Sequence, residues 1–455
     1  MSLSRKSLVL LVLITFAICF YLFATYTDIV PTLLPFSVLV PGDVSAVWSR
    51  GPHHYREANA DESTTGVPEF AASFSECTTG AASAHVRNTT TDVANSTVSN
   101  NQNTSDVISS ELHQNTDMMG QCNRLPFLAC DQTKMNVSVT KQFRVSVLRR
   151  PSWMQAFSFH QCEYPNCLFD DSQVTEDTDL VILYVGGLND NYRPPKRWPH
   201  ERYAAAVWES PHHTGASFLY DSHSVWNHAF NLTATYRTDS DIFIPYSRLR
   251  FQPKPVKERP NYGEIAKMKN KTAAWFVSNC KTQSRREDYV KEMQKYIDVD
   301  IYGACGQPCS KDNPDCLAQL PWQYMFYLSF ENSICTDYVT EKLFKLFEPE
   351  MHIVPVVRGG ANYDRHLPKD TVVNAANFKS AKDLALHLKT LAGDWKAYSK
   401  LLEYKDMYRS DSSQGIDGIA CIACKFLNTK PVESKVYDMK AWMGDNHCRE
   451  PNDIT

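Results

Sequence analysis

The sequence predicts an α/β fold with two doubly wound, Rossmann-like domains that face a cleft. Short, continuous apolar runs alternate with amphipathic stretches from about residue 143 onward. Such runs are typical of strands that are buried on both faces of a parallel sheet. A bridge rich in Pro and Lys at residues 250–271 divides them into two groups. Two groups separated by a linker favour two sheets over one.

The predicted elements follow from the apolar pattern in chain order. The first group comprises four predicted strands, at residues 143–148, 180–187, 203–210 and 241–246. The second group comprises three, at residues 273–279, 324–332 and 351–357. Apolar residues recur at helical spacing in two stretches that join these strands, at residues 284–297 and 380–391.

The N-terminus has the composition of a membrane anchor. Residues 7–26 carry no charge, and a helix of this length spans about 30 Å, the thickness of a bilayer core. Arg5 and Lys6 precede this run, so the positive-inside tendency predicts a cytosolic tail at residues 1–6 and a lumenal remainder. A cleaved signal peptide is the alternative, but its apolar region is usually about 7 to 15 residues long.

Residues 27–140 are predicted to form a disordered, glycosylated stem. They are rich in Ser, Thr, Asn, Ala and Asp, so they cannot bury enough apolar surface to offset the entropy of ordering. Six Asn-x-Ser/Thr sequons follow the anchor, at Asn88, Asn95, Asn103, Asn136, Asn231 and Asn270. Their position agrees with a lumenal location, where glycosylation takes place.

Charge and cysteine usage narrow the class of protein. A net charge of −4 and a pI near 6.4 lack the basic footprint of a nucleic-acid-binding protein. Thirteen of the fourteen cysteines follow the anchor, which favours an oxidising compartment and disulfides. Because thirteen is odd, one thiol is expected to be free or to pair between chains, and Cys77 and Cys335 are the candidates.

A candidate anion site follows the strand predicted at residues 324–332. In open α/β sheets, ligands bind beyond the carboxyl ends of the strands, against the start of the next helix. Thr336 or Asp337 is predicted to cap this helix, which places Glu341 and Lys342 in its first turns. Both charges would then lie within reach of an anion.

A second basic group follows the neighbouring predicted strand. Arg285 and Arg286 stand at the start of the helix predicted after residues 273–279. Cations at two neighbouring strand ends suit a diphosphate, whose charge must be neutralised as it departs. The residues alone do not decide between a nucleotide-sugar site and ordinary surface charges.

These segments resemble a known family. "FYLSFENSICTDYVTEKLF" followed by "IVPVVRGGANYDRHLPKDTVV" resembles the donor-binding signature of the α1,3-fucosyltransferases, glycosyltransferase family 10. Further matches are "WESPHH", "FNLTATYRTDSDIFIPY" and "VSNC" followed by Arg286, and the resemblance covers roughly residues 143–430. It implies a GT-B fold, a GDP-fucose donor and an inverting transfer in the Golgi lumen.

The resemblance also implies a role for each matching residue. Donor binding is implied for Arg286, Glu331, Asn332, Tyr338, Glu341 and Lys342. Among these, Lys342 and Arg286 match the cations that bind the diphosphate, Glu341 the carboxylate that accepts the ribose hydroxyls, and Tyr338 a residue that lines the nucleotide. The other two are expected to face the donor near its sugar and phosphate.

Glu209 matches the glutamate proposed as catalytic base in this family. An α-linked product from GDP-β-L-fucose requires one displacement, so a single carboxylate that deprotonates the acceptor hydroxyl is enough. Without the resemblance, Glu209 is better explained as a helix-cap or turn carboxylate before Pro211.

The resemblance gives the domain bounds as well. They are an acceptor-side Rossmann-like domain at 141–262, a GDP-fucose-binding domain at 263–410 and a C-terminal segment at 411–455 that returns to the first domain. Two disulfides are implied between this segment and the first domain, among Cys162, Cys167, Cys421 and Cys424. A zinc site made by the four thiolates is the alternative.

The resulting hypothesis is a single-pass type II Golgi α1,3-fucosyltransferase that acts on a GlcNAc residue of glycoprotein N-glycans, in the core or in a LacNAc or LacdiNAc antenna. The expected partners are GDP-fucose, the glycan acceptor and the Golgi membrane, without nucleic acid. No cofactor or metal ligand is expected, and the sequence decides neither stimulation by Mn²⁺ or Mg²⁺ nor homodimerisation. The alternatives are a metal-dependent GT-A transferase that uses Asp239 and Asp241, and an inactive membrane-tethered glycan-binding protein.

Overall fold

The structure, a computed structural model, describes residues 124–129 and 141–454, apart from 172, 189–190, 216–218, 220, 222, 310–314, 432–434 and 445–446. The chain divides into two compact units, Met1–Ala46 and Val47–Thr455, and every described residue belongs to the second. The predicted anchor, Cys77 and the sequons at Asn88, Asn95, Asn103 and Asn136 lie outside the described residues. Within the described part, no helix has the length and apolar character needed to cross a membrane.

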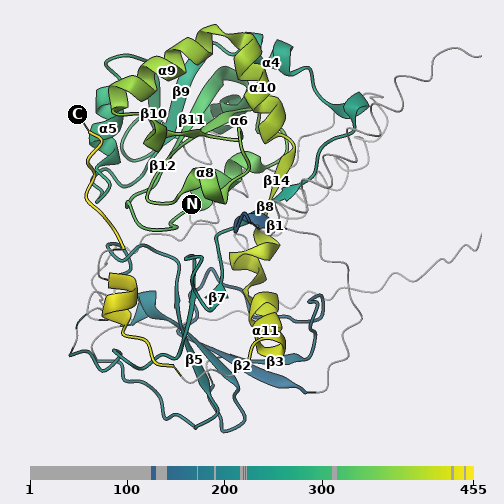
Figure 1. Ribbon diagram of the computed structural model, residues 1–455, viewed down its shortest axis with the longest axis vertical. Coiled ribbons are helices and arrows are strands. Elements are labelled where there is room, and N and C mark those ends of the chain that lie inside the picture. The colour runs from purple at the N-terminus through teal and green to yellow at the C-terminus, as the bar shows by residue number, and fades with distance from the viewer. Residues whose placement is uncertain are drawn as a thin grey trace, which may run out of the picture. The chain divides into compact units, whose positions relative to one another are not determined.

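A six-stranded parallel sheet forms the first half of the described chain. Its strand order is β3-β2-β4-β5-β6-β7. The strands are β2 Phe143–Leu148, β3 Cys167–Asp171, β4 Leu180–Tyr184, β5 Arg202–Val207, β6 Leu232–Thr235 and β7 Ile242–Phe243. All six residues of β5 are buried, as the continuous apolar run predicts. In Figure 1 the helix α11, Ile419–Thr429, lies against this sheet.

A five-stranded parallel sheet forms the second half, in the order β10-β9-β11-β12-β13. Its strands are β9 Lys271–Phe276, β10 Val299–Tyr302, β11 Tyr324–Phe330, β12 Val354–Arg358 and β13 Val373–Asn374. Each of the seven predicted strands therefore corresponds to an observed one, and the α/β class is confirmed. The strand predicted at 241–246 is shorter than expected, with only two residues in β7.

Helices cover both faces of the five-stranded sheet (Figure 1). On one face lie α4 Tyr262–Met268, α5 Arg286–Met293, α9 Ala381–Gly393 and α10 Trp395–Lys405, which share one hydrophobic cluster with the sheet. On the other face, Leu320 of α6, Asp315–Gln323, packs with Tyr324 and Ile353. The remaining short helices are α7 Glu341–Phe344, α8 Tyr363–His366, η2 Val185–Gly187, η4 Val256–Glu258, η5 Lys345–Phe347, η6 Ala375–Asn377, η7 Ser412–Gln414, η8 Ile416–Gly418 and η9 Lys440–Gly444.

A small third sheet was not predicted. It consists of β1 Leu128–Ala129, parallel to β8 Arg248–Phe251, and β14 Tyr408–Asp411, antiparallel to β8. The stem predicted at 27–140 is therefore wrong for residues 124–129. Phe127 is fully buried, with its ring 5.7 Å from that of Phe243 and 6.0 Å from that of Phe344. Its apolar neighbours are too few to show a period, so the sequence pattern did not reveal the contact.

The bridge at 250–271 is also more ordered than a linker. It contains α4, whose N-terminus is capped by the side chain of Asn261. Ile265 and Ala266 of this helix are buried in the hydrophobic cluster of the five-stranded sheet. Prolines and lysines on either side of a short helix concealed it in the sequence.

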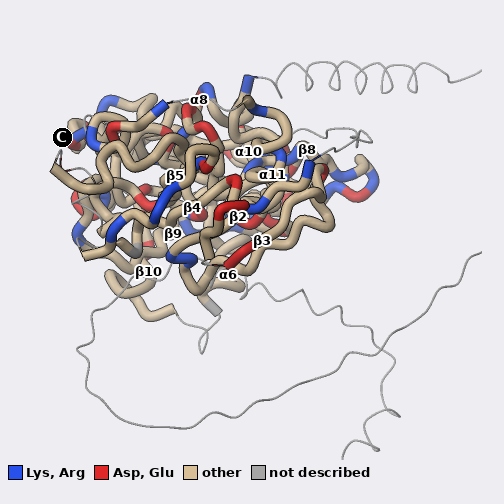
Figure 2. The backbone as a smooth tube through the Cα atoms, turned by 90° about the horizontal axis from the view of Figure 1, so that it is seen from below, with Lys and Arg blue, Asp and Glu red and all other residues tan. Residues whose placement is uncertain are grey.

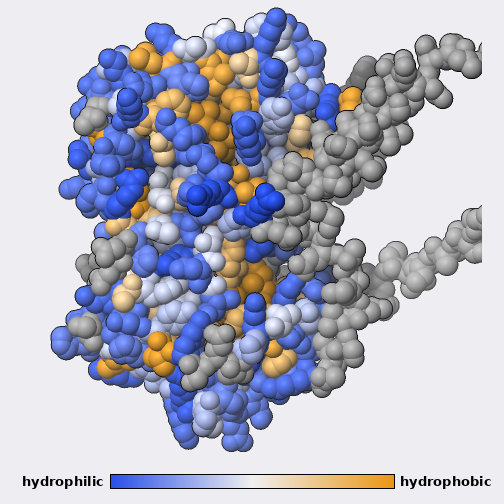
Figure 3. Space-filling model, in the orientation of Figure 1, coloured by the Kyte–Doolittle hydropathy of each residue, from blue (hydrophilic) through white to orange (hydrophobic). Residues whose placement is uncertain are grey.

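The surface carries mixed charge and mixed polarity. Figure 2 shows Lys and Arg interspersed with Asp and Glu along the backbone, without a large face of one sign. The face in Figure 3 is mostly hydrophilic, and hydrophobic side chains gather in its upper part. Large exposed hydrophobic residues of the four helices α4, α6, α9 and α10 are Met268, Trp322, Leu386, Trp395 and Tyr404. A homodimer stays a prediction.

Five disulfides join described cysteines. They are Cys162–Cys421, Cys167–Cys424, Cys280–Cys305, Cys309–Cys316 and Cys335–Cys448. The first two tie α11 to the region of β3, as the resemblance implied, so the four thiols are not zinc ligands here. The prediction that Cys335 is a free thiol is wrong, because Cys335 forms a disulfide with Cys448. No pattern in the sequence connected Cys448 with the segment that contains Cys335.

We predict that the two bonds to α11 act redundantly. Each closes a loop of more than 250 residues, but with one bond intact the other restricts only a short segment of the unfolded chain. Removing either bond by Cys→Ser substitution should cost about 2 to 3 kcal/mol, and removing both should cost more than the sum. Denaturant unfolding of the two single-bond variants and the double variant measures this, and additive losses would contradict it.

Candidate active site

The site lies where two neighbouring strands of the five-stranded sheet end. In the order β10-β9-β11, the chain moves from β9 to β10 on one side and then to β11 on the other. The gap between β9 and β11 is thus a topological switch point, where open parallel sheets bind ligands. The segment after β9 leads to Arg286, and the segment after β11, here called loop 331–340, leads to Glu341 and Lys342.

Loop 331–340 ends at a different cap from the one predicted. Helix α7 begins at Glu341, and its N-cap is Thr340, whose hydroxyl accepts from Lys342 N. The predicted caps Thr336 and Asp337 are wrong. Asp337 has a φ of 58° and its Oδ2 accepts hydrogen bonds from the backbone N and the hydroxyl of Thr238, at 3.1 and 2.6 Å.

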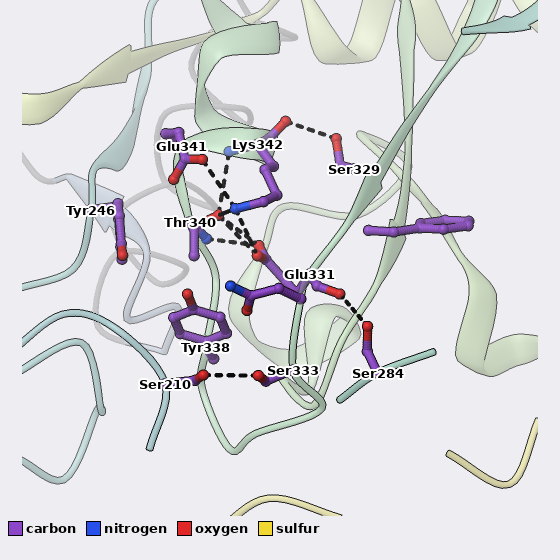
Figure 4. A network of polar contacts seen from close by, with 12 residues as sticks. Ser210, Tyr246, Ser284, Ser329, Glu331, Ser333, Tyr338, Thr340, Glu341 and Lys342 are labelled. Atoms are coloured by element: carbon purple, nitrogen blue, oxygen red, sulfur yellow. Dashed lines mark hydrogen bonds and ion pairs between the residues drawn. The ribbon is translucent and has the colours of Figure 1, made fainter. Parts of the chain in front are cut away.

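Glu331, Thr340 and Lys342 form a buried polar network (Figure 4). The Glu331 carboxylate accepts hydrogen bonds from Thr340 N at 2.9 Å and from the Thr340 hydroxyl, and lies 3.5 Å from Lys342 Nζ. Burial raises the pKa of Glu331, against the effect of Lys342. Burial alone would lower the pKa of Lys342, but Glu341 and Glu331 hold it above its ordinary value. Lys342 is thus a fixed cation.

Glu341 is the more accessible of the two carboxylates beside Lys342. Its Oε1 lies 3.0 Å from Lys342 Nζ, and its side chain is 40% exposed, against 1% for Glu331. Although burial opposes ionisation, Lys342 lowers the pKa of Glu341. Glu331 therefore lies on the buried side of Lys342, and Glu341 lies on its solvent-exposed side.

The Arg286 side chain donates hydrogen bonds near the ends of both β9 and β11. It is 4% exposed, and its Nη1 donates to Phe330 O at 2.7 Å. Its Nε has no hydrogen-bond partner among the described residues. Burial lowers the pKa of this guanidinium, and Glu331 is the carboxylate that opposes the shift most. Of the two predicted diphosphate cations, Lys342 is the more exposed, at 22% of its side chain.

Glu209 follows β5 of the other sheet and meets loop 331–340. Three donors converge on its Oε1: Ser210 N at 2.9 Å, Asn332 Nδ2 at 3.3 Å and the Tyr338 hydroxyl. No hydrogen bond to Oε2 is found within the described part of the chain. Burial, then Glu209, raises the pKa of Tyr338 well above its ordinary value, so its hydroxyl stays a donor. One carboxylate oxygen is therefore anchored, and the other has no hydrogen bond to a described residue.

Further contacts that sequence reasoning missed hold the two sheets together at this point. The hydroxyls of Ser210 and Ser333, both fully buried, lie 2.8 Å apart (Figure 4). The ring of Tyr338 packs 5.0 Å from that of Tyr236 and 6.4 Å from that of Tyr246. Both serines stand next to predicted site residues, in "WESP" and "FENS". This adjacency was the only feature of the sequence that could have indicated their contact.

Asn332 carries an unsatisfied acceptor next to Glu209. Its side chain is 4% exposed and its Oδ1 has no partner among the described residues. Leaving a buried polar atom unpaired costs about 1 to 3 kcal/mol. A ligand hydroxyl would remove that cost.

The Asp-x-Asp motif is occupied by protein contacts. Asp239 forms an ion pair with Arg237 at 2.6 Å. Asp241 pairs with Lys435 and accepts from the Tyr437 hydroxyl at 2.9 Å. No group of three or more potential metal ligands occurs among the described residues. These carboxylates thus give no support to the metal-dependent alternative.

The two described sequons differ in environment. Asn270 is exposed, whereas Asn231 is half-buried and its Oδ1 accepts a hydrogen bond from Tyr203 N at 2.6 Å. Whether either carries a glycan stays a prediction.

Two parallel sheets that meet at a carboxylate and a buried cation are the arrangement expected of a transferase that handles an anionic nucleotide. Two family models match the chain: "Fucosyltransferase, N-terminal" at residues 111–247 and "Glycosyltransferase family 10 (fucosyltransferase) C-term" at residues 266–442. Together they cover most of it. The chain belongs to glycosyltransferase family 10, the fucosyltransferases, and the predicted family is confirmed.

The names of similar curated proteins agree with membership of this family. The chain is 37% identical over 293 residues to "Alpha-(1,3)-fucosyltransferase C" of Drosophila melanogaster, which covers 60% of this chain and 66% of that protein. It is 33% identical over 279 residues to "4-galactosyl-N-acetylglucosaminide 3-alpha-L-fucosyltransferase FUT5" of Homo sapiens, which covers 60% and 71%. A crystal structure of an alpha1,3-fucosyltransferase with GDP-fucose matches 69% of this chain and 98% of that one, at 14% identity and a TM-score of 0.43. Membership therefore rests on the family models and sequence relatives.

We predict that Thr340 holds the network together through its hydroxyl. Thr340→Val keeps the volume and the backbone donor but removes the hydroxyl that donates to the buried Glu331 carboxylate, which should cost about 1 to 3 kcal/mol of stability. Thr340→Ser, which keeps the hydroxyl, is the matched control and should stay within about 1 kcal/mol of the parent. Chemical denaturation measures both, and a loss in Thr340→Val no larger than that in Thr340→Ser would contradict the role of the hydroxyl.

Proposed function

We propose that the chain is an α1,3-fucosyltransferase that transfers L-fucose from GDP-β-L-fucose to a GlcNAc residue of a glycoprotein N-glycan, with inversion. The observation that carries the proposal is the anchored carboxylate of Glu209, whose Oε1 takes donors from both sheets. The names of the relatives and the family support the reaction. The two parallel sheets that meet at this carboxylate support a GT-B architecture.

In the proposed reaction, Glu209 accepts the proton of the acceptor hydroxyl. Its Oε1 is held by three donors, so Oε2 is the atom placed to take the proton. The hydroxyl oxygen bonds to the anomeric carbon of fucose as the bond to GDP breaks. Lys342 and Arg286 stabilise the growing charge on the diphosphate, and the open acceptor on Asn332 receives a hydroxyl of the donor.

The proposed location is the Golgi membrane, with the catalytic part in the lumen. The support is the uncharged run at 7–26, preceded by Arg5 and Lys6, and the disulfides of the folded unit. The acceptor, in the core or in an antenna of the glycan, is best identified with a panel of GlcNAc-containing glycans read by mass spectrometry. Failure to release GDP with every acceptor would instead favour a glycan-binding protein without activity.

We predict that Glu209→Gln separates binding from turnover. The amide keeps the shape but cannot accept the proton, so kcat should fall by about 10² to 10⁴ while GDP affinity is kept. Tyr338→Phe is the comparison variant. It removes one of the three donors to Glu209 Oε1 but leaves the carboxylate in place, so kcat should fall less than in Glu209→Gln. Steady-state kinetics and calorimetric GDP titration measure both. Full activity in Glu209→Gln would remove it as the base.

We predict that Lys342→Ala weakens GDP binding by about tenfold or more, because it removes the accessible cation of the site. Lys291→Ala, which removes an exposed lysine of α5, is the matched control and should bind GDP like the parent. Calorimetric titration of the two variants measures the difference. Equal affinity in both would show that Lys342 does not contact the diphosphate.

A further inference from the structure

A hollow lies at the amino-terminal ends of three strands of the six-stranded sheet. It contains about 710 Å³ of free space, including its open mouth. Its walls come from the amino ends of β5, β6 and β7 and from α11 and the segment after it. The lining residues are Arg202, Asn231, Leu232, Ser240, Asp241, Phe426, Lys430, Pro431 and Lys435.

This hollow is separate from the candidate active site. Arg202 is the first residue of β5, and Glu209 follows the other end of the same strand. Seven residues of extended chain span about 20 Å, at roughly 3.3 Å per residue. The two places therefore cannot share one small ligand.

Arg202 is the chemical centre of the hollow. It is 9% exposed, yet its Nη1 has no hydrogen-bond partner among the described residues. A buried guanidinium with an unpaired nitrogen is costly, because the group has lost water without gaining an acceptor. A guanidinium presents a planar set of donors that matches carboxylate, sulfate and phosphate groups.

The described lining of the hollow carries more basic than acidic side chains. Asp241 is the one carboxylate among the described lining residues, and it is neutralised by Lys435 and bonded by the Tyr437 hydroxyl. Arg202 and Lys430 are then the remaining charges of the described lining. Burial lowers the pKa of the Arg202 guanidinium, and the Asp179 carboxylate, which lies outside the lining, opposes this shift.

The other walls suit a sugar ring. Leu232, Phe426 and Pro431 offer apolar surface, on which the C–H face of a saccharide can pack. Asn231 uses its Oδ1 for Tyr203 N, which leaves its amide nitrogen to donate. Apolar walls and an amide donor are features of sites for small organic ligands, and an inorganic anion would not use them.

We propose that this hollow binds an acidic saccharide, whose carboxylate or sulfate is held by Arg202 and Lys430. The proposal is independent of fucosyl transfer. If the proposed function holds as well, the hollow would give the enzyme a second contact with glycans that carry an acidic sugar.

The test is a calorimetric titration of the full-length chain with 3′-sulfolactose, 3′-sialyllactose, lactose and inorganic sulfate. N-glycans are trimmed beforehand, because Asn231 belongs to a sequon. At least one acidic saccharide should bind at least tenfold more tightly than both lactose and sulfate. Arg202→Gln should lose this binding by at least tenfold, and Lys430→Ala, which changes an exposed residue, by at least threefold. Lys425→Ala removes a lysine of α11 outside the hollow and should leave it unchanged.

Three results would overturn the proposal. Lactose binding as tightly as both acidic saccharides would remove the role of the charge, and sulfate binding as tightly would leave a site for small anions only. Equal affinity in Lys430→Ala and Lys425→Ala would place the binding elsewhere, even if Arg202→Gln fails to fold. Lys342→Ala should keep full affinity for the acidic saccharide, so failure of this proposal and failure of the proposed function are distinguishable.

Discussion

The structure depends on the contact between Glu209 and loop 331–340. Glu209 follows β5 in one sheet, whereas Asn332 and Tyr338 follow β11 in the other, and both donate to the same carboxylate oxygen. The hydrogen bond between Ser210 and Ser333 lies beside this contact. A carboxylate anchored in this way is correctly oriented only when the two sheets are correctly packed. The orientation of Glu209 therefore depends on the packing of the two sheets.

Loop 331–340 can be buried although it is polar, because its polar groups form hydrogen bonds and ion pairs with one another. The Glu331 carboxylate is paired with the hydroxyl and backbone N of Thr340 and lies near Lys342. An isolated buried charge would lower the stability by several kcal/mol. Removing one member of a pair therefore leaves the other as an uncompensated buried charge. Close approach of the backbone contributes as well, because a Cβ on Gly360 would lie 2.3 Å from Cys335 O. The segment after β12 therefore packs directly on the loop.

The sequence predicted those parts that repeat a local pattern. The runs at 143–148 and 324–332 are buried strands because continuous apolar residues require two covered faces. The site could be placed because strand ends of parallel sheets bind ligands, and β9 and β11 are neighbours. The sequence could not predict the position of Phe127 or the Cys335–Cys448 bond. Each depends on a contact with residues more than one hundred positions away. The domain bounds and residue roles stay predictions.

The two glutamates beside Lys342 differ in a way that bears on how the proposed donor would bind. Glu331 is enclosed and cannot leave Lys342, so it fixes the position of the lysine. Glu341 is 40% exposed and can turn toward solvent. A diphosphate approaching from the open side would replace Glu341 as the partner of Lys342, since two anions cannot share one ammonium face without repulsion. The displaced carboxylate would then be free to accept hydroxyls of the ribose. In the proposed donor complex, Glu341 and Lys342 would thus separate, and Glu331 would remain as the counter-charge of the lysine.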